Sequence, residues 1–250
     1  MRYFVQFSYN GKAYHGWQNQ PNAISVQQVL EESFATLFKK PIALVGAGRT
    51  DTGVHAKQMF AHFDCDGIVD TNDMIYRLNA LLPDDIAVQK IFEATEEAHA
   101  RFDAAKRTYE YVVTQRKNPF YFDSAHYVRL PLDLDKMNEA AALLLQYEDF
   151  ECFSKSNTDV HTYRCDVKKA EWTKKEDVLV FTISANRFLR NMVRAIVGTL
   201  LDVGLGKRTL ADVKAVLNSK DRSKAGVSVP AKGLYLTKIS YPNTIIPKHG

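Results

Sequence analysis

The chain has 250 residues, of which 46% are hydrophobic, and a formal net charge of +4. This is enough material for one large core or two cores of ordinary domain size, which excludes a disordered chain. The longest apolar run, 140–145, is far too short to cross a bilayer, and the N-terminus lacks the long apolar segment of a signal peptide. Three widely spaced cysteines without a Cys-x-x-Cys pair favour a reduced, cytoplasmic protein with no metal site.

The first half of the chain mixes strand and helix patterns. Alternation predicts a strand over 2–9, which the turn dipeptide Asn10-Gly11 ends. Ser25 has the character of an N-cap, and apolar residues at helical spacing predict a helix from there to Lys39. The other elements predicted in this half are strands over 42–45, 58–64 and 86–92 and a helix over 72–81.

The second half restarts with a similar pattern, since Arg107 to Tyr111 resembles the start of the first strand. The predicted elements are strands over 106–114 and 233–241, a hairpin of 165–172 with 178–185, and helices over 135–146, 188–203 and 210–217. Strands mixed with helices, with a hairpin among them, predict an α+β fold with a largely antiparallel sheet covered by helices. We place the two halves at 1–104 and 105–250.

A glycine-rich turn over 46–56 contains one acid beside an arginine. Gly46, Gly48 and Gly53 permit positive φ and the close approach of another backbone or a ligand. Arg49 lies two residues from Asp51, and its fixed charge would favour the ionised carboxylate if both side chains share one space. Such a carboxylate can act as a nucleophile or a base. The alternative is a surface turn with an incidental ion pair.

Three familiar motifs come close to this turn. Asp51 occupies the third glycine position of a dinucleotide fingerprint, and Val54-His55 stands where a phosphate-binding loop has Lys and Ser or Thr, so both motifs fail. Asp51-Thr52-Gly53 spells the aspartic-protease triplet, whose chemistry needs a second carboxylate. The chain has one such triplet. A symmetric dimer could supply the other, so this alternative stays open.

Basic residues are concentrated near the C-terminus. The segment 186–224 has nine basic and three acidic residues, a net charge of +6, which is typical of an anion-binding surface or of a solvated helix face. The helix predicted from Phe188 would put Arg187, Arg190 and Arg194 on one stripe, which suits phosphates or a carboxylate.

Aromatic residues supply candidate stacking surfaces. On the strand over 106–114, Tyr109 and Tyr111 share a face with Arg107, and tyrosines on a sheet can stack nucleobases. Core packing is the alternative for both tyrosines, and it is our prediction for Trp17.

Several segments, taken together, resemble the tRNA pseudouridine synthase A family. The family's catalytic signature Gly-Arg-Thr-Asp-Ala-Gly-Val-His-Ala is matched by 48–56, except that Thr52 replaces the usual Ala. The other matching segments are 9–20 with Gly16-Trp17-Gln18, 25–28, 98–104 running into 106–109, 186–194 with Val197-Gly198, and 230–236. Their order and spacing cover nearly the whole chain.

The resemblance implies a role for individual residues. Asp51 is then the catalytic aspartate, Arg49 assists in displacing the target base, and Arg194 pairs with Asp51. Tyr109 would stack on the uracil, and Leu234 would line its pocket. The residues expected along the RNA are His99, Arg101 and Phe102, joined by Arg187 and Arg190 of the basic segment.

The resemblance also implies two related α+β halves that form a mixed sheet with a central catalytic cleft, and a homodimer. The implied reaction isomerises uridines at positions 38 to 40, in the anticodon stem-loop of tRNA, without a metal or a small-molecule cofactor. Two departures from the family pattern, Thr52 and Val227-Ser228-Val229 in place of Pro-Thr-Ala, would affect loop rigidity without removing a reacting group. An RNA-binding protein without chemistry remains the competing class.

Overall fold

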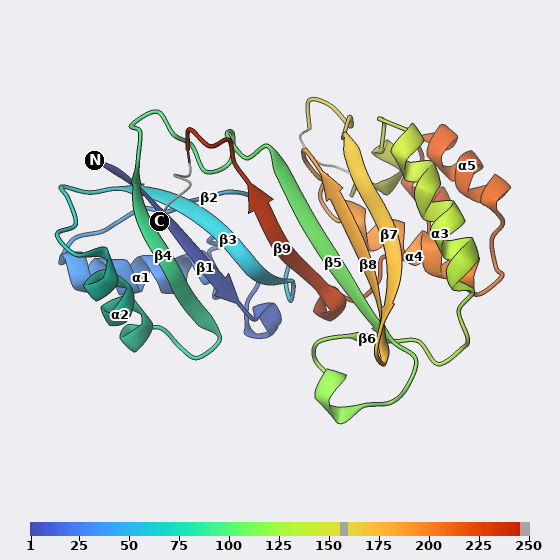
Figure 1. Ribbon diagram of the computed structural model, residues 1–250, viewed down its shortest axis with the longest axis horizontal. Helices are drawn as coiled ribbons and strands as arrows, with labels where there is room; N and C mark the ends of the chain where they lie inside the picture. The colour runs from blue at the N-terminus through green and yellow to red at the C-terminus, as the bar shows by residue number, and fades with distance from the viewer. Residues whose placement is uncertain (156–159, 246–250) are drawn as a thin grey trace. The chain divides into compact units, whose positions relative to one another are not determined.

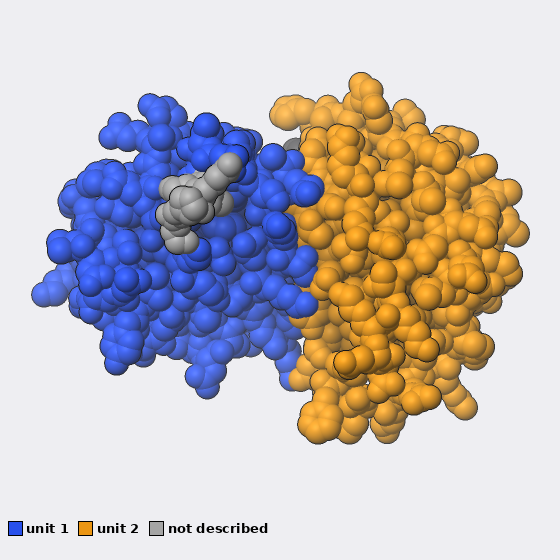
Figure 2. Space-filling view, in the orientation of Figure 1, with its two compact units in different colours: residues 1–106, 236–250 blue, residues 107–235 orange. Residues whose placement is uncertain are grey.

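The computed structural model describes residues 1–155 and 160–245, which contain nine strands and five α-helices (Figure 1). At least five strand pairings in the described residues are antiparallel, whereas β6 (His126–Tyr127) runs parallel to β5 (Lys106–Thr114), so the predicted α+β class with a mixed, largely antiparallel sheet is confirmed. The chain divides into two compact units (Figure 2). Unit 1 comprises Met1–Lys106 and the chain from Leu236 onward, and unit 2 comprises Arg107–Tyr235. The C-terminal strand therefore groups with the first half of the sequence.

Unit 1 is a sheet in the order β4-β1-β3-β9 with two helices. Its elements are β1 (Arg2–Tyr9), α1 (Val26–Phe38), β2 (Val45–Gly46), β3 (His55–Asp64), α2 (Thr71–Leu81), β4 (Ile86–Ala94) and β9 (Leu234–Ser240), whose first two residues belong to unit 2. The β1–β3 register runs from Arg2 opposite Asp64 to Tyr9 opposite Ala56. The short β2 pairs antiparallel with β3, with Val45 opposite His62, just before the glycine-rich turn.

Helix α1 begins and ends where its sequence predicts. The side chain of Ser25 accepts a hydrogen bond from the backbone of Gln28, and Lys39 ends the helix in a left-handed conformation with φ 54°. Leu30 and Phe34, one turn apart, are fully buried. The ring of Phe34 meets Phe63 of β3 edge-on at 4.9 Å, which fixes the helix on the sheet.

Unit 2 is a sheet in the order β5-β8-β7 covered by three helices. Its elements are β5 (Lys106–Thr114), β6 (His126–Tyr127), α3 (Leu134–Leu143), β7 (Val167–Lys175), β8 (Val178–Ala185), α4 (Met192–Gly204) and α5 (Leu210–Ser219). Tyr111, Phe181 and Trp172 lie opposite one another across the three strands and are buried. Helix α4 is buried along almost its whole length, beneath α3.

Three predicted elements differ most from the structure, while the strands predicted over 58–64 and 165–172 differ by two or three residues at their ends. The strand predicted over 42–45 is reduced to Val45–Gly46, and the helix predicted over 135–146 ends at Leu143, after which one 3-10 turn continues to Gln146. The helix predicted from Phe188 begins at Met192, because Asn191 has a left-handed backbone with φ 66° that interrupts a helix. No helix within 1–155 and 160–245 has both the length and the hydropathy of a membrane span.

Candidate active site and RNA-binding residues

The turn that carries Asp51 joins β2 to β3 in unit 1. Its first residue, Ala47, donates a backbone hydrogen bond to the carbonyl of Phe60 (2.8 Å). At its far end the backbone N–H of Val54 donates to the carbonyl of Asp51 (3.1 Å), which closes a tight turn at Gly53 with φ 77°. The carboxylate of Asp51 is therefore presented from a short turn that is fixed at both ends.

The segment 9–17 fixes the residues on either side of Asp51. The hydroxyl of Tyr9 lies 2.8 Å from the hydroxyl of Thr50, whose carbonyl accepts from the backbone N–H of Trp17 (3.3 Å). The N–H of Gly53 donates to the carbonyl of Tyr14 (3.3 Å). The contact between the Tyr9 and Thr50 hydroxyls was not predicted from the sequence, in which Tyr9 is only the last residue of a strand. Asp51 itself is half-buried, whereas its neighbours Arg49 and Thr52 are exposed.

The glycines of the turn have different roles. A Cβ atom at Gly46 would lie 2.4 Å from Nε1 of Trp17, so only glycine fits under the buried indole. Gly53 has the positive φ that we expected. Gly48 has neither feature, since nothing lies within 4 Å of the position of its Cβ. The freedom that glycine permits is thus used at Gly46, for a close approach, and at Gly53, for a positive φ, but not at Gly48. Trp17 stacks on Phe7 at 5.2 Å and is a core residue, as predicted.

The turn over 98–104, also in unit 1, presents an aromatic ring and a cation together. Nδ1 of His99 accepts from the backbone N–H groups of Arg101 (3.1 Å) and Phe102 (3.3 Å). The ring of His99 packs on that of Phe102 at 4.2 Å, and the Arg101 guanidinium lies 5.8 Å from the centre of the same ring. Phe102 is 74% exposed. An ordered, exposed ring beside a cation suits an unstacked nucleobase.

A buried histidine, His62, contacts the turn over 98–104 from the sheet. Nδ1 of His62 on β3 accepts from the backbone N–H of Ala100 (3.1 Å), and its ring contacts His99 edge-on at 4.6 Å. Burial, reinforced by the nearby charge of Arg2, lowers the pKa of His62 to about 4. The neutral imidazole is the form that can accept the hydrogen bond from Ala100.

The two tyrosines of β5 in unit 2 have separate fates. Tyr111 is fully buried; its hydroxyl donates to the carbonyl of Pro230 (2.8 Å), and Gly233 lies against its ring. Burial raises the pKa of this phenol. Tyr109 is half-buried and meets Phe188 edge-on at 5.2 Å. Core packing is thus the role of Tyr111, and Tyr109 is the tyrosine of the pair that retains accessible ring surface.

Arg194, in the first turn of α4, is fixed by the segment 226–229. Its Nε donates to the carbonyl of Val229 (2.7 Å), and the N–H of Val229 donates back to the carbonyl of Arg194 (3.2 Å). This segment lies flush on the helix, since a Cβ at Gly198 would be 1.9 Å from the carbonyl oxygen of Val227. The direction of the Arg194 guanidinium is therefore set by backbone atoms, which no side-chain pattern in the sequence could reveal.

The Val227-Ser228-Val229 departure preserves this anchoring. The hydroxyl of Ser228 accepts from Nδ2 of Asn191 (2.5 Å) and from Nη2 of Arg222 (2.8 Å). Val227 points into solvent at 86% exposure. Arg194 contacts backbone atoms of Val229 in this triplet, so the change of side chains from the family pattern leaves that contact intact.

Arg187 and Arg190 lie before α4, in the link from β8, so the prediction that they share a helical stripe with Arg194 is wrong. Their backbones are held individually: Oδ1 of Asn186 accepts from the N–H of Arg187 (2.8 Å), and the carbonyl of Arg190 accepts from the N–H of Lys155 (3.0 Å). Arg190 is exposed. Leu234, by contrast, is a buried residue at the start of β9.

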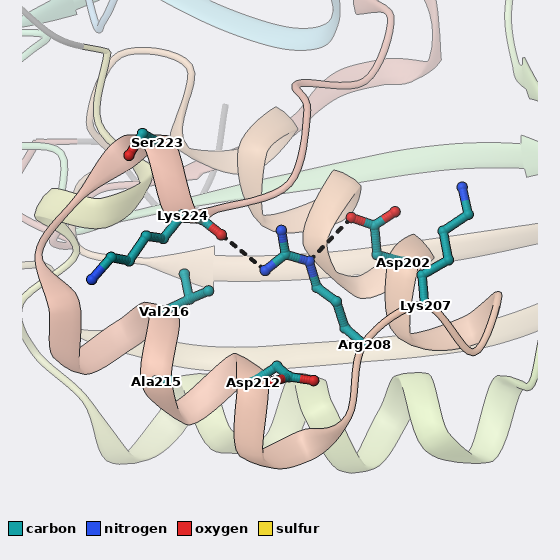
Figure 3. Close-up of a pocket in the computed structure, with 8 residues that line it drawn as sticks. All are labelled: Asp202, Lys207, Arg208, Asp212, Ala215, Val216, Ser223 and Lys224. Atoms are coloured by element: carbon teal, nitrogen blue, oxygen red, sulfur yellow. Dashed lines mark hydrogen bonds and ion pairs between the residues drawn. The ribbon is translucent and has the colours of Figure 1, made fainter.

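A separate cavity of about 660 Å³ lies where α5 faces the end of α4 (Figure 3). Its lining residues are Asp202, Lys207, Arg208, Asp212, Ala215, Val216, Ser223 and Lys224. The Arg208 guanidinium contacts Oδ2 of Asp202 (3.2 Å) and donates to the carbonyl of Lys224 (2.8 Å), as Figure 3 shows. Two acids offset much of the positive charge here, so this part of the basic segment is nearly balanced.

The site residues predicted from the sequence fall in both units. Unit 1 contains Arg49, Asp51, His99, Arg101 and Phe102, and unit 2 contains Tyr109, Arg187, Arg190, Arg194 and Leu234. Within the described ranges, no group of three or more His, Cys, Asp or Glu side chains is arranged to hold a metal ion.

Comparison with known proteins identifies the family. The family model described as "tRNA pseudouridine synthase" matches residues 6–103 and 140–242. The chain is 51% identical over 249 residues to "tRNA pseudouridine synthase A" of Parabacteroides distasonis and 50% identical over 246 residues to the protein of that name in Bacteroides fragilis, with 98% of each chain covered. It is 41% identical over 247 residues to "tRNA pseudouridine synthase A" of Bacillus subtilis, covering 97% of this chain and all of that one. The chain belongs to the tRNA pseudouridine synthase A family and is an isomerase.

Proposed function

We propose that this protein isomerises uridine to pseudouridine at positions 38 to 40, in the anticodon stem-loop of tRNA, with Asp51 as the catalytic group. The observation that carries the proposal is the placing of Asp51. It lies at the centre of the family signature, on a turn whose backbone is fixed on both sides by hydrogen bonds. A reacting group held this way needs little reorganisation when the substrate binds.

The reaction breaks the C1′–N1 bond of uridine, turns the uracil and joins its C5 to C1′. C5 loses a proton and N1 gains one, so atoms and electrons balance within the nucleotide and solvent. Asp51 either attacks C1′ or removes a ribose proton. Hydrolysis of a glycosidic bond would call for a second carboxylate acting with water, whereas the signature offers one.

For the other residues we propose the roles that the family resemblance implies. Arg194 pairs with Asp51 and keeps it ionised, and Arg49 assists in displacing the target base. Tyr109 stacks on the uracil and Leu234 lines its pocket, which keeps water from the detached base. The target nucleotide has to leave its stack, at about a few kcal/mol, and stacking on Tyr109 offsets part of that.

The remaining candidates hold the RNA. Arg187 and Arg190 bind phosphates, while His99, Arg101 and Phe102 contact the RNA from unit 1 through the exposed ring and cation of their turn. The proposal includes a cytoplasmic homodimer that uses neither a metal nor a small-molecule cofactor.

The test uses tRNA transcribed without modification and tritiated at C5 of its uridines. Forming pseudouridine releases the C5 proton, so we expect one to three equivalents of tritium to be released into solvent per tRNA molecule. Binding of the tRNA without any release would instead support an RNA-binding protein without chemistry. Cleavage of peptides at acid pH, with indifference to RNA, would support the protease alternative.

A further inference from the structure

The loop between β5 and α3, residues 115–133, exposes an unusual amount of aromatic surface. Phe120 is 90% exposed, Phe122 71% and Tyr127 45%, and Leu130 beside them is 57% exposed. Figure 1 shows this loop extending past the end of β5, around β6. Exposed large apolar groups are normal singly, but several in one loop indicate an interaction site.

This exposure belongs to an ordered loop. Within it, the side chain of Asn118 accepts from the backbone of Phe120 (2.9 Å) at the start of a 3-10 turn over Pro119–Tyr121. Several hydrogen bonds join the loop to its surroundings in unit 2. Among them are those from Lys232 Nζ to the carbonyl of Phe122 (2.6 Å), from the Tyr235 hydroxyl to the carbonyl of Ser124 (2.7 Å), and from the N–H of Val128 to the carbonyl of Thr114 (2.9 Å). The aromatic rings are therefore presented at low entropic cost to a partner.

The charge around the rings is positive. Arg116, Lys117 and Arg129 are exposed in the loop, against two acids, Asp123 and Asp133. Asp133 pairs with Lys136 (3.1 Å), and Arg116 lies 3.9 Å from Asp177. Nζ of Lys232 lies 5.3 Å from the centre of the Phe122 ring. Rings that offer a face for stacking, set among cations, match the two parts of RNA, its bases and its phosphates.

A second copy of this chain fits the surface less well. Pairing about a two-fold axis that passes through this loop would bring the cations of one copy against the same cations of the other. Like charges facing each other oppose association. A polyanion is the better complement.

We infer that the loop over 115–133 is a secondary RNA-binding surface, on which Phe120 and Phe122 stack unpaired bases while the neighbouring cations hold phosphates. The inference rests on the proposed function for its substrate, tRNA. Thr114 lies five residues after Tyr109 along β5, at a distance of ~17 Å. The loop therefore contacts nucleotides other than the one stacked on Tyr109.

The test compares Phe120→Ala/Phe122→Ala with the matched control Tyr76→Ala, which removes a 75% exposed ring from α2 in unit 1. Base stacking on an aromatic ring contributes about 1–3 kcal/mol by alanine substitution, so we expect the double variant to bind tRNA at least about tenfold more weakly. KM rises in parallel while kcat at saturating tRNA stays unchanged. The salt dependence of binding keeps its slope, because no phosphate contact is lost. Phe120→Tyr/Phe122→Tyr retains the rings and restores affinity.

Other outcomes would overturn the inference. Unchanged tRNA affinity in the double alanine variant would show that the rings do not contact RNA. Dissociation of a wild-type dimer into monomers by the same variant, in sedimentation, would assign the surface to a second copy instead. Because affinity is measured separately from tritium release, a wild-type protein that binds tRNA without isomerising it would overturn the proposed function and leave the stacking result standing.

Discussion

Replacing Gly46 with alanine tests whether the segment 9–17, which we call the aromatic clamp because Tyr9, Tyr14 and Trp17 hold the turn, positions Asp51. The added Cβ would lie 2.4 Å from Nε1 and 2.5 Å from Cε2 of Trp17, whereas non-bonded carbon contacts are normally ~3.5–4.0 Å. The indole has to move by roughly 1 Å. It cannot move freely, because Trp17 is buried and stacks on Phe7, and the backbone N–H of Trp17 donates to the carbonyl of Thr50 beside Asp51.

Overpacking of this kind costs about 1–3 kcal/mol. At roughly 2–4 °C per kcal/mol for a chain of this size, the midpoint of thermal unfolding should fall by about 2–12 °C. Gly48→Ala is the matched control in the same turn. Its Cβ meets nothing within 4 Å, and its φ is not in the left-handed region, so the midpoint should stay or rise slightly.

The midpoint of thermal unfolding is measured for both variants by circular dichroism, and their activity by tritium release from tRNA. We expect Gly46→Ala to melt earlier and to isomerise more slowly, because the indole shift is passed to Thr50. Equal melting of Gly46→Ala and Gly48→Ala would refute the clamp. Normal isomerisation by a destabilised Gly46→Ala would show that the clamp supports folding without positioning Asp51.

Three further predictions concern other parts of the chain. His62 has a pKa of about 4 in the folded protein and near 6.5 in the unfolded chain, so the unfolded chain binds the extra proton and the free energy of unfolding falls as pH drops from 6.5 to 4. His62→Asn, which keeps an acceptor for the N–H of Ala100, should reduce this fall in urea unfolding measured against pH. The same pH dependence in the variant and the wild type would contradict the prediction. Gly198→Ala should displace the carbonyl of Val227, lower the melting midpoint and slow tritium release through Arg194, and a variant with wild-type values for both would disprove the close contact. Arg190→Ala should weaken tRNA binding and reduce the salt slope by about one unit; unchanged affinity at low and high salt would exclude Arg190 as a phosphate contact.

Local sequence patterns predicted much of this fold because local physics decides those elements. Strands β1 and β5 have the predicted bounds, and Ser25 caps α1 as its side-chain chemistry requires. The start of α4 was missed because Asn191 adopts a left-handed conformation while its side chain bonds to Ser228, 37 residues away. Hydrophobic periodicity alone predicted that the helix begins at Phe188.

The candidate site divides in the same way. The signature turn and the role of Gly53 could be read from residue types and their order. The clamp could not, because it depends on backbone carbonyls of Tyr14 and Thr50 that every sequence possesses. Likewise, nothing in the pattern around Tyr111 distinguished a stacking ring from a buried one until the close approach of Gly233 was seen.

Asp51→Ala, compared with Asp84→Ala at an exposed acid of unit 1, tests the central claim most directly. We expect tritium release from C5-labelled tRNA to be abolished in Asp51→Ala, with tRNA affinity within about twofold of wild type, and both quantities to be normal in Asp84→Ala. Release of tritium by Asp51→Ala at the wild-type rate would contradict the claim that this carboxylate performs the isomerisation.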